Sequence, residues 1–457
     1  MDISAYHRDC PLNLPGHSAP LVPRLVAVGR HPPPRSRVQT RRRGYSDVKY
    51  AGRQRMFDEC SKRTCYRRGM QQGETVGEHI AHWRKVRGLT QHQLAARANV
   101  SRSMLAQVET GKASGSTVWV GAIANALRID ASRLYGAGQE PEPLADVLPV
   151  LRRALAATDP LNPDSEPAPF DELRRLSAKV ARWRIDARYR RIADVLPDLV
   201  DSLLVAGHQT GRPAYAMLTD AYRAANTVAH KFGYTDLSLT ATERMEWAAT
   251  RSGDPLLLAT THYVKAASLA RIGASAHALR LLNQSMSDIE PLVEEDATAA
   301  AVYSILHMRA GTIAAATGDA DTSRGHLEAA ERLAPQIGDR VIYGSPVGPA
   351  NVRLYRLCAE VDLGEPGRAV DIAKGTRLPQ GMAAERQAYF WVDAARAHLL
   401  NGDPDSAIGA LLESRLAAPE HFRSSPAVKN AIRTTAQQQR RANDSLRSLA
   451  NAAGIDD

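Results

Sequence analysis

Apolar residues between positions 88 and 112 recur at intervals of three and four, which is the pattern of amphipathic helices. The spacing predicts two short helices that bury a common side. The residues expected on that side are Leu89, Leu94, Ala95, Ala98, Val100, Leu105 and Val108. Hydrogen-bonding side chains fall on the opposite side, namely Gln91, Arg102, Ser103 and Gln107. We therefore expect a helix pair with a polar outer surface.

The segment between these two helices has the residues of a tight turn. Asn99 belongs to the few non-glycine residue types that enter the left-handed region at low cost. Val100 follows as an apolar plug, and Ser101 is a strong N-cap for the second helix. This order predicts a helix-turn-helix motif, whose second helix enters the major groove of duplex DNA.

With its flanks, from Gly73 to about Tyr135, the segment resembles the Cro/repressor (xenobiotic-response-element) family of bacterial DNA-binding domains. The family pattern is present as Arg84, Gly88 to Gln91, Leu94 and Ala95, Val100 and Ser101, Glu109, and Gly111 and Lys112. The resemblance implies five helices, of which the outer three lie at about 76–87, 117–127 and 131–135, with Ile80 and Trp83 facing inward. Two departures are Asn99, where the family usually has Gly, and Gly115 with Ser116, where it has Pro.

The same resemblance implies roles for individual side chains. Gln91 is expected to reach a phosphate, helped by the N-terminal dipole of its helix. Arg102 suits a guanine edge and Gln107 an adenine edge, with Ser103 beside them. Ser101 and Lys112 complete the expected DNA contacts. Arg84 and Glu109 are expected to form a buried ion pair. The alternatives are a solvated helix face for Arg102 and Gln107, and ordinary surface charges for Arg84 and Glu109.

Beyond residue 143 the chain reads as paired amphipathic helices without a convincing strand pattern, so the predicted fold class is all-α. Four pairs of residues mark an internal repeat: Gly273 with Pro291, Gly318 with Pro335, Gly364 with Pro379, and Gly402 with Pro419. We expect each glycine between two helices, Ala369 and Ala407 in helix crossings, and each proline at the end of the second helix. The units resemble tetratricopeptide repeats, although their spacing is longer, and such repeats stack into a superhelix with a concave face.

The combination also looks like a broad group of actinobacterial regulators that join this helix-turn-helix to such repeats. That resemblance implies an effector, either a peptide or a small molecule, on the concave surface. The candidate ligand-binding residues are Asn351, Arg353, His307 and Arg309, with Tyr355 nearby. Asn351 and Arg353 are favoured, because an amide and a guanidinium can hold a ligand backbone or carboxylate. The alternative is that they cap loops or pair with carboxylates such as Glu360.

The net charge of +10 is concentrated at one end of the 457-residue chain. Residues 1–73 contain 15 Lys and Arg against 5 Asp and Glu, and the rest of the chain is neutral overall. This stretch reads as a disordered basic extension. One interpretation is an arm that adds phosphate contacts. The favoured one is upstream sequence from a start codon placed too early, with Met56 and Met70 as alternative starts.

Little in the sequence supports a metal site or a catalytic site. Cys60, Cys65, His79 and His82 approach a zinc-finger spacing, but the two histidines fall on a predicted helix and are closer together than usual, so we expect no metal. Cys358 is expected in a core. Few cysteines, no signal peptide and no long apolar run favour a cytoplasmic protein with no membrane span. No nucleophile, acid/base pair or cofactor motif stands out, so the chain is not expected to be an enzyme.

The sequence thus predicts a regulator in four parts: an extension (1–73), a helix-turn-helix domain (74–138), a linker with a connecting helix (139–169) and a repeat domain (170–457). Its expected partner is double-stranded DNA, bound as a homodimer because one small domain buries little surface. The repeats are expected to sense a ligand or to mediate dimerisation. The alternative is a protein-interaction scaffold with secondary DNA binding.

Overall fold

Helices account for nearly all regular structure in the part of the chain that the computed structural model describes, which is residues 75–135, 148–156, 158–160, 166, 168–439 and 444–455. The all-α prediction is confirmed. These residues belong to one compact unit, Arg67–Asp457. The predicted extension, Cys60, Cys65 and the linker at 136–143 lie outside the described residues. Within the described ranges, no helix is long and apolar enough to cross a membrane.

Five helices form the N-terminal domain, close to the predicted positions. They are α2 (Val76–Val86), α3 (Gln91–Ala98), α4 (Arg102–Glu109), α5 (Thr117–Leu127) and α6 (Ser132–Tyr135). The first four each begin at a side-chain oxygen that accepts a hydrogen bond from a backbone N–H of the first turn, on Thr75, Thr90, Ser101 and Ser116. Asn99 ends α3 in the left-handed conformation (φ 51°), as predicted.

The core of this domain contains all seven apolar residues predicted from helical spacing. Ile80 and Trp119 are fully buried beside them, whereas Trp83 is only partly buried. Gly115 has no room for a side chain, because an added Cβ would lie 2.4 Å from the Trp119 ring. The loop before α5 therefore depends on glycine for close packing, in place of the expected family proline.

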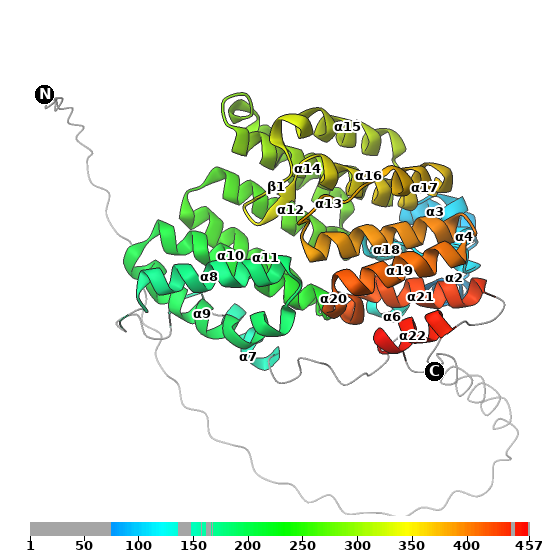
Figure 1. Cartoon of the computed structure of the whole chain (residues 1–457), viewed down its shortest axis with the longest axis horizontal. Coiled ribbons are helices and arrows are strands. Elements are labelled where there is room, and N and C mark those ends of the chain that lie inside the picture. Colours follow the sequence, from blue (N-terminus) through cyan, green and yellow to red (C-terminus); the bar gives the residue numbers. More distant parts are fainter. Residues whose placement is uncertain are drawn as a thin grey trace, which may run out of the picture. The chain divides into compact units, whose positions relative to one another are not determined.

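The remaining described chain is a stack of helices with two short strands. Its elements are α7 (Leu148–Ala156), α8 (Phe170–Ile185), α9 (Tyr189–Thr210), α10 (Arg212–Lys231), α11 (Thr235–Ser252), α12 (Pro255–Arg271), α13 (Ser275–Ile289), η1 (Glu290–Leu292), α14 (Ala297–Ala316), α15 (Ala320–Ile337), β1 (Arg340–Ile342), β2 (Ser345–Val347), α16 (Pro349–Leu363), α17 (Pro366–Gly375), α18 (Ala384–Leu400), α19 (Pro404–Ala417), α20 (Pro419–Ser424), α21 (Pro426–Gln438) and α22 (Asp444–Ala452). Helices α10 to α19 pack in consecutive pairs, side by side in Figure 1.

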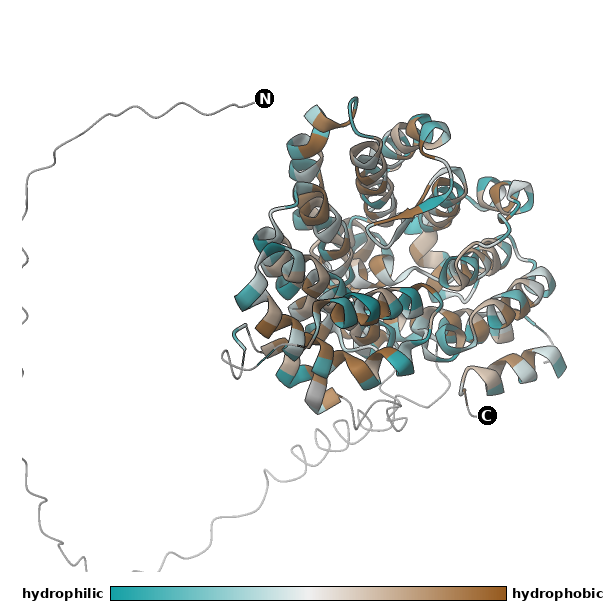
Figure 2. Cartoon of the chain, turned by 60° about the vertical axis from the view of Figure 1, so that its left-hand side comes forward, coloured by the Kyte–Doolittle hydropathy of each residue, from teal (hydrophilic) through white to brown (hydrophobic). Residues whose placement is uncertain are grey.

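The first helices of successive pairs also contact one another in series. Helix α12 packs on α14, α14 on α16, and α16 on α18. We call α10, α12, α14, α16 and α18 the inner helices. Hydrophobic and hydrophilic positions alternate along the helices of the stack in Figure 2, as expected for helices that bury one stripe. Neighbour contacts of this kind are how a repeat array is stabilised.

The four repeat glycines lie in turns between paired helices. Each has a positive φ between 76° and 83°, which glycine adopts without strain. Ala369 and Ala407 are fully buried, as predicted for helix crossings. One expectation is wrong, because Pro335 lies inside α15, which continues to Ile337. There the chain turns instead at Gly338, whose φ is 67°.

A β-hairpin between α15 and α16 corrects the expectation of a region without strands. The strands β1 and β2 are antiparallel, and Ile342 pairs with Ser345. The two turn residues, Tyr343 and Gly344, both have positive φ (43° and 64°). This conformation matches the twist of a two-residue hairpin. Each strand has only three residues, which is too short for an alternating pattern to be visible in the sequence.

The N-terminal domain packs against the inner helices. Helix α5 contacts α12 and α14, and Gly121 approaches so closely that an added Cβ would lie 2.3 Å from the carbonyl oxygen of Arg271. Ala316 and Leu400 of the helical region belong to the apolar cluster of the N-terminal domain. The amide of Gln438 donates to the carbonyl oxygen of Lys112 at 3.0 Å. The inner face, expected to be an open concave surface, is therefore partly covered by the chain's own N-terminal domain.

Candidate nucleic-acid interface

Helix α4 carries the predicted base-reading residues on one face. Arg102 and Ser103 are exposed in its first turn, and Gln107 is partly exposed one turn later. The Gln107 side-chain amide donates to the Ser103 hydroxyl at 3.2 Å, which holds both side chains on the same face. Met104, Leu105 and Val108 are buried on the opposite face. The amphipathic division predicted for this helix is therefore present.

A buried ion pair joins helices α2 and α4. The Arg84 guanidinium donates two hydrogen bonds to the Glu109 carboxylate, from Nε at 2.6 Å and from Nη2 at 2.8 Å. Their side chains are 13% and 5% exposed, so solvent screens the pair weakly. The hydrogen bond to Glu109 raises the pKa of Arg84. Two parallel bonds between planar groups fix the orientation of α4 relative to α2.

Gln91 takes part in the same network. Its side-chain nitrogen donates to Glu109 Oε2 at 2.8 Å, so the amide bridges α3 and α4. The sequence assigned Gln91 to a phosphate contact only. Since an amide has two N–H bonds and an oxygen, one N–H and the oxygen remain available for a further partner. Sequence reasoning missed this bridging role, which depends on the packing of α3 against α4.

The other two predicted DNA contacts flank α4. The Ser101 hydroxyl accepts from the backbone N–H of Met104 at 3.4 Å and so caps the helix. Lys112 follows the helix and its side chain is exposed. Arg97 on α3 and Arg102 on α4 are exposed on the same motif. Exposed cations around a recognition helix are the electrostatic requirement for phosphate binding.

Of the four residues with the zinc-like spacing, the structure describes only His79 and His82. His79 is buried in α2, and its Nδ1 donates to the carbonyl oxygen of Leu134 at 2.8 Å, which ties α2 to α6. His82 is exposed and lies edge-on to Trp83. Within the described residues no group of three or more His, Cys, Asp or Glu side chains could hold a metal ion.

The four predicted ligand-binding residues do not come together. Asn351 is buried and donates to the carbonyl oxygen of Pro346 at 2.7 Å, so it anchors β2. Arg353 is exposed in a different groove, beside Glu331. His307 faces α15, where its Nδ1 lies 2.8 Å from that of His326. Only Arg309 lines the inner face.

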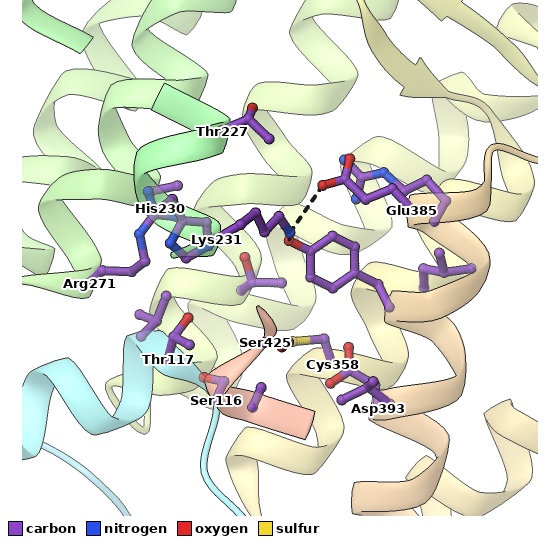
Figure 3. A pocket seen from close by; sticks show the side chains of 18 of the residues that line it. Ser116, Thr117, Thr227, His230, Lys231, Arg271, Cys358, Glu385, Asp393 and Ser425 are labelled. Carbon is purple, nitrogen blue, oxygen red and sulfur yellow. Dashed lines mark hydrogen bonds and ion pairs between the residues drawn. The ribbon is translucent and has the colours of Figure 1, made fainter. Parts of the chain in front are cut away.

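A cavity of about 240 Å³ lies between the inner helices and the start of α5. Figure 3 shows Ser116 and Thr117 entering from α5, opposite Lys231 on α10 and Glu385 on α18. Arg309 and Cys358 line it from α14 and α16. Burial raises the pKa of the Cys358 thiol, and this residue is a cavity wall rather than a core residue. The cavity has walls from both the DNA-binding domain and the helical region.

A chain of buried polar contacts connects this cavity to α5. Arg396 forms an ion pair with Asp362, and both side chains are 2% exposed. Arg396 Nε also donates to the carbonyl oxygen of Ser114 at 2.9 Å. Asp362 in turn accepts from the Ser116 hydroxyl at 2.5 Å. The loop before α5 is thus held by charged groups of the helical region that also line the cavity.

Comparison with known proteins agrees with this geometry. Residues 75–134 match a family model described as a helix-turn-helix domain. The immunity repressor protein of Bacillus phage phi105 is 35% identical over 105 residues, which cover 20% of this chain and 73% of the repressor. No solved structure matches the chain. The chain therefore belongs to the helix-turn-helix family of Cro/repressor-like DNA-binding transcriptional regulators.

Proposed function

We propose that the chain is a sequence-specific transcriptional regulator that places α4 in the major groove of its operator. The observation that carries this proposal is the exposed face of Arg102, Ser103 and Gln107 on a helix anchored by Arg84 and Glu109. A guanidinium and an amide can each make two hydrogen bonds to one base edge, to guanine and adenine respectively. Gln91, Ser101 and Lys112 then position the domain on the backbone.

We further propose that two copies bind one operator. A single domain of this size offers one short helix to the groove, and two half-sites a helical turn apart supply the affinity that one lacks. The operator is then an inverted repeat with half-site centres about 10 bp apart or a multiple of that.

The helical region acts in this proposal as the regulatory part of the chain. Support comes from its packing on the N-terminal domain and from the cavity that both parts line. An effector in that cavity alters DNA binding if it prefers one arrangement of α5 over another. This interpretation is favoured over a scaffold role, because α5 covers part of the inner face that would bind a protein partner.

The test is a selection of random duplex DNA with the full chain, followed by sequencing. We expect one enriched motif with two related halves, and a complex whose mass by light scattering contains two chains. Arg102→Ala should change the preferred base at one position in each half. Arg423→Ala, which removes an exposed charge from α20, is the matched control and should leave the motif unchanged. Selection of no motif would contradict specific recognition.

A further inference from the structure

The cavity between α5 and the inner helices is strongly cationic. Its lining contains seven Lys and Arg residues but only three Asp and Glu residues. Burying like charges together is unfavourable unless something compensates them. The seven cations differ in whether they already have an anionic partner.

All three lining carboxylates are engaged by two of the cations. Arg396 pairs with Asp362 and with Asp393, the latter at 2.6 Å. Lys231 pairs with Glu385 at 3.0 Å. These three pairs are largely buried, and together they engage every carboxylate of the lining. The charges of Arg386 and Arg184 also act on Glu385. Five arginines of the lining remain.

Two of the five arginines hold the hairpin turn. Arg223 donates to the carbonyl oxygen of Tyr343 and, at 2.6 Å, to the Ser345 hydroxyl. Arg184 donates to the carbonyl oxygen of Gly344 at 2.5 Å. These partners are neutral, and the nearby carboxylate of Asp220 offsets part of the charge on both arginines. The hairpin turn thus lies beside two guanidinium groups whose direct hydrogen-bond partners are neutral.

The other three arginines have still weaker partners. Arg309 lies over the ring of Tyr263 at 4.4 Å, and Arg386 lies 5.7 Å from the ring centre of Tyr389. The Nε atoms of Arg309 and Arg386 are buried and have no hydrogen-bond partner among the described residues. Among the described residues, the Arg271 side chain donates to two serine hydroxyls, the nearer being Ser268 at 2.9 Å. A buried donor without an acceptor is costly, so such a site favours a ligand that supplies one.

The positive charges of the cavity shift the pKa values of neighbouring side chains. Although burial alone would raise the pKa of Tyr263, the charges of Arg309 and Arg386 lower it to about 7. Burial and then the adjacent charges of Arg271 and Lys231 lower the pKa of His230. The lowered pKa of the Tyr263 phenol indicates a site that favours negative charge.

We propose that this cavity binds a small organic anion with at least two carboxylate or phosphate groups, held by Arg309, Arg386 and Arg271. The guanidinium fork matches both groups, because each presents oxygens for two parallel hydrogen bonds. A volume of about 240 Å³ is below the roughly 300–1,000 Å³ of pockets for drug-sized ligands, so the site suits a metabolite better than a peptide.

The site is placed to influence DNA binding, an aspect that rests on the proposed function. Ser116, which caps α5, and Thr117 at the start of α5 line the same cavity as the three anchors. The backbone of Arg271, one of the anchors, also lies against Gly121 of α5. Ligand binding therefore changes how firmly α5 is held to the helical region.

The test uses the full chain with two probes, pyrophosphate for phosphate groups and citrate for carboxylates. Thermal unfolding and calorimetric titration are measured against potassium chloride at equal ionic strength. At least one probe should raise the Tm saturably, and comparison of the two distinguishes the acid groups. Arg309→Gln and Arg386→Gln should each weaken binding at least tenfold. Arg353→Gln, on the separate groove, is the control and should bind like the wild type.

Folding of the variants is checked by circular dichroism without probe. Arg309→Lys keeps the charge and should retain part of the binding, which separates lost charge from lost structure. The proposal is overturned if neither probe shifts the Tm beyond the chloride control, or if both Gln variants bind as the wild type does. DNA selection is measured separately, so loss of anion binding with an intact motif rejects this inference alone. Anion binding without any motif rejects the proposed function alone.

Discussion

The hydroxyl of Ser116 donates to the carboxylate of Asp362 at 2.5 Å, and the backbone N–H of Ser116 donates to the same group at 3.3 Å. Ser116 also caps α5, since its hydroxyl oxygen accepts from the N–H of Trp119 at 3.2 Å. One serine therefore both starts a helix of the DNA-binding domain and ties that helix to the end of α16. Because Asp362 is paired with Arg396, this junction depends on a buried charge.

Replacing Asp362 should loosen this junction. Asp362→Ala leaves the buried Arg396 without its closest carboxylate, and breaking such a pair costs about 3–5 kcal/mol. The free energy of unfolding from denaturant titration measures the loss, and amide exchange should accelerate in α5. Asp186→Ala, which removes an exposed partner of Arg182, is the control and should cost less than about 1 kcal/mol. Equal effects of the two variants would contradict a buried role for Asp362.

The base-reading residues should affect specificity more than general affinity. Arg102→Ala and Gln107→Ala should each weaken operator binding by about 1–3 kcal/mol and relax the preference at one base position. Fluorescence anisotropy with operator and with scrambled DNA measures both effects. Lys112→Ala removes a charge aimed at the backbone and should weaken the two DNAs alike. Equal losses on both DNAs for Arg102→Ala would assign Arg102 to the backbone instead.

The network behind α4 should contribute to stability. Glu109→Ala leaves Arg84 without the carboxylate that holds it and removes the acceptor of Gln91, which should cost on the order of 3 kcal/mol. Glu109→Gln keeps the shape and should cost less. Amide exchange of α2 to α4 in the full chain reports the local free energy. Unchanged protection in Glu109→Ala would mean that apolar packing alone orients α4.

Acid should destabilise the pair α14 and α15 through His307. Burial, with the positive charges of His326 and Arg332, lowers the pKa of His307 to about 4. The unfolded chain therefore takes up a proton near pH 6.5 that the folded chain refuses, and stability falls as the pH drops from about 6.5 toward 4. His307→Gln should flatten this slope, whereas His208→Gln on the exposed end of α9 should leave it unchanged. A slope that both variants share would assign the protons elsewhere.

The residues of the helix-turn-helix were predictable because their determinants are local. Spacings of three and four mark the buried side, Ser101 and Thr90 are N-caps, and Asn99 tolerates a left-handed turn. The turns at Gly273, Gly318, Gly364 and Gly402 follow from the same kind of short-range pattern. Two predictions for the helical region were wrong, also for local reasons. Pro335 is accommodated within α15, and the strands around Tyr343 are too short to show an alternating pattern.

The candidate ligand site could not be predicted in this way. Asn351 and Arg353 lie near each other in the sequence, yet the Asn351 side chain is buried beside β2 and the Arg353 side chain is exposed. The reason is that residues two positions apart on a helix point in different directions. Arg271, Arg309 and Arg386 were not recognisable as a group, although each lies on an inner helix. Only a comparison of equivalent positions on those helices could have identified the three arginines as a group from the sequence.

The sequence by itself determined the helical class, the polar outer face of the helix-turn-helix and the paired helices, since these depend on contacts within about one turn of helix. Only the tertiary structure decided where α5 rests, which charges are paired and that a cationic cavity lies between α5 and the inner helices. Those properties depend on burial and on neighbours from distant helices, because the strength of an electrostatic interaction is set by its surroundings. An arginine in the printed sequence is a cation in any setting. Folding decides whether it is paired with a carboxylate, as Arg396 is, or lies over an aromatic ring with a buried Nε that has no hydrogen-bond partner among the described residues, as Arg309 does.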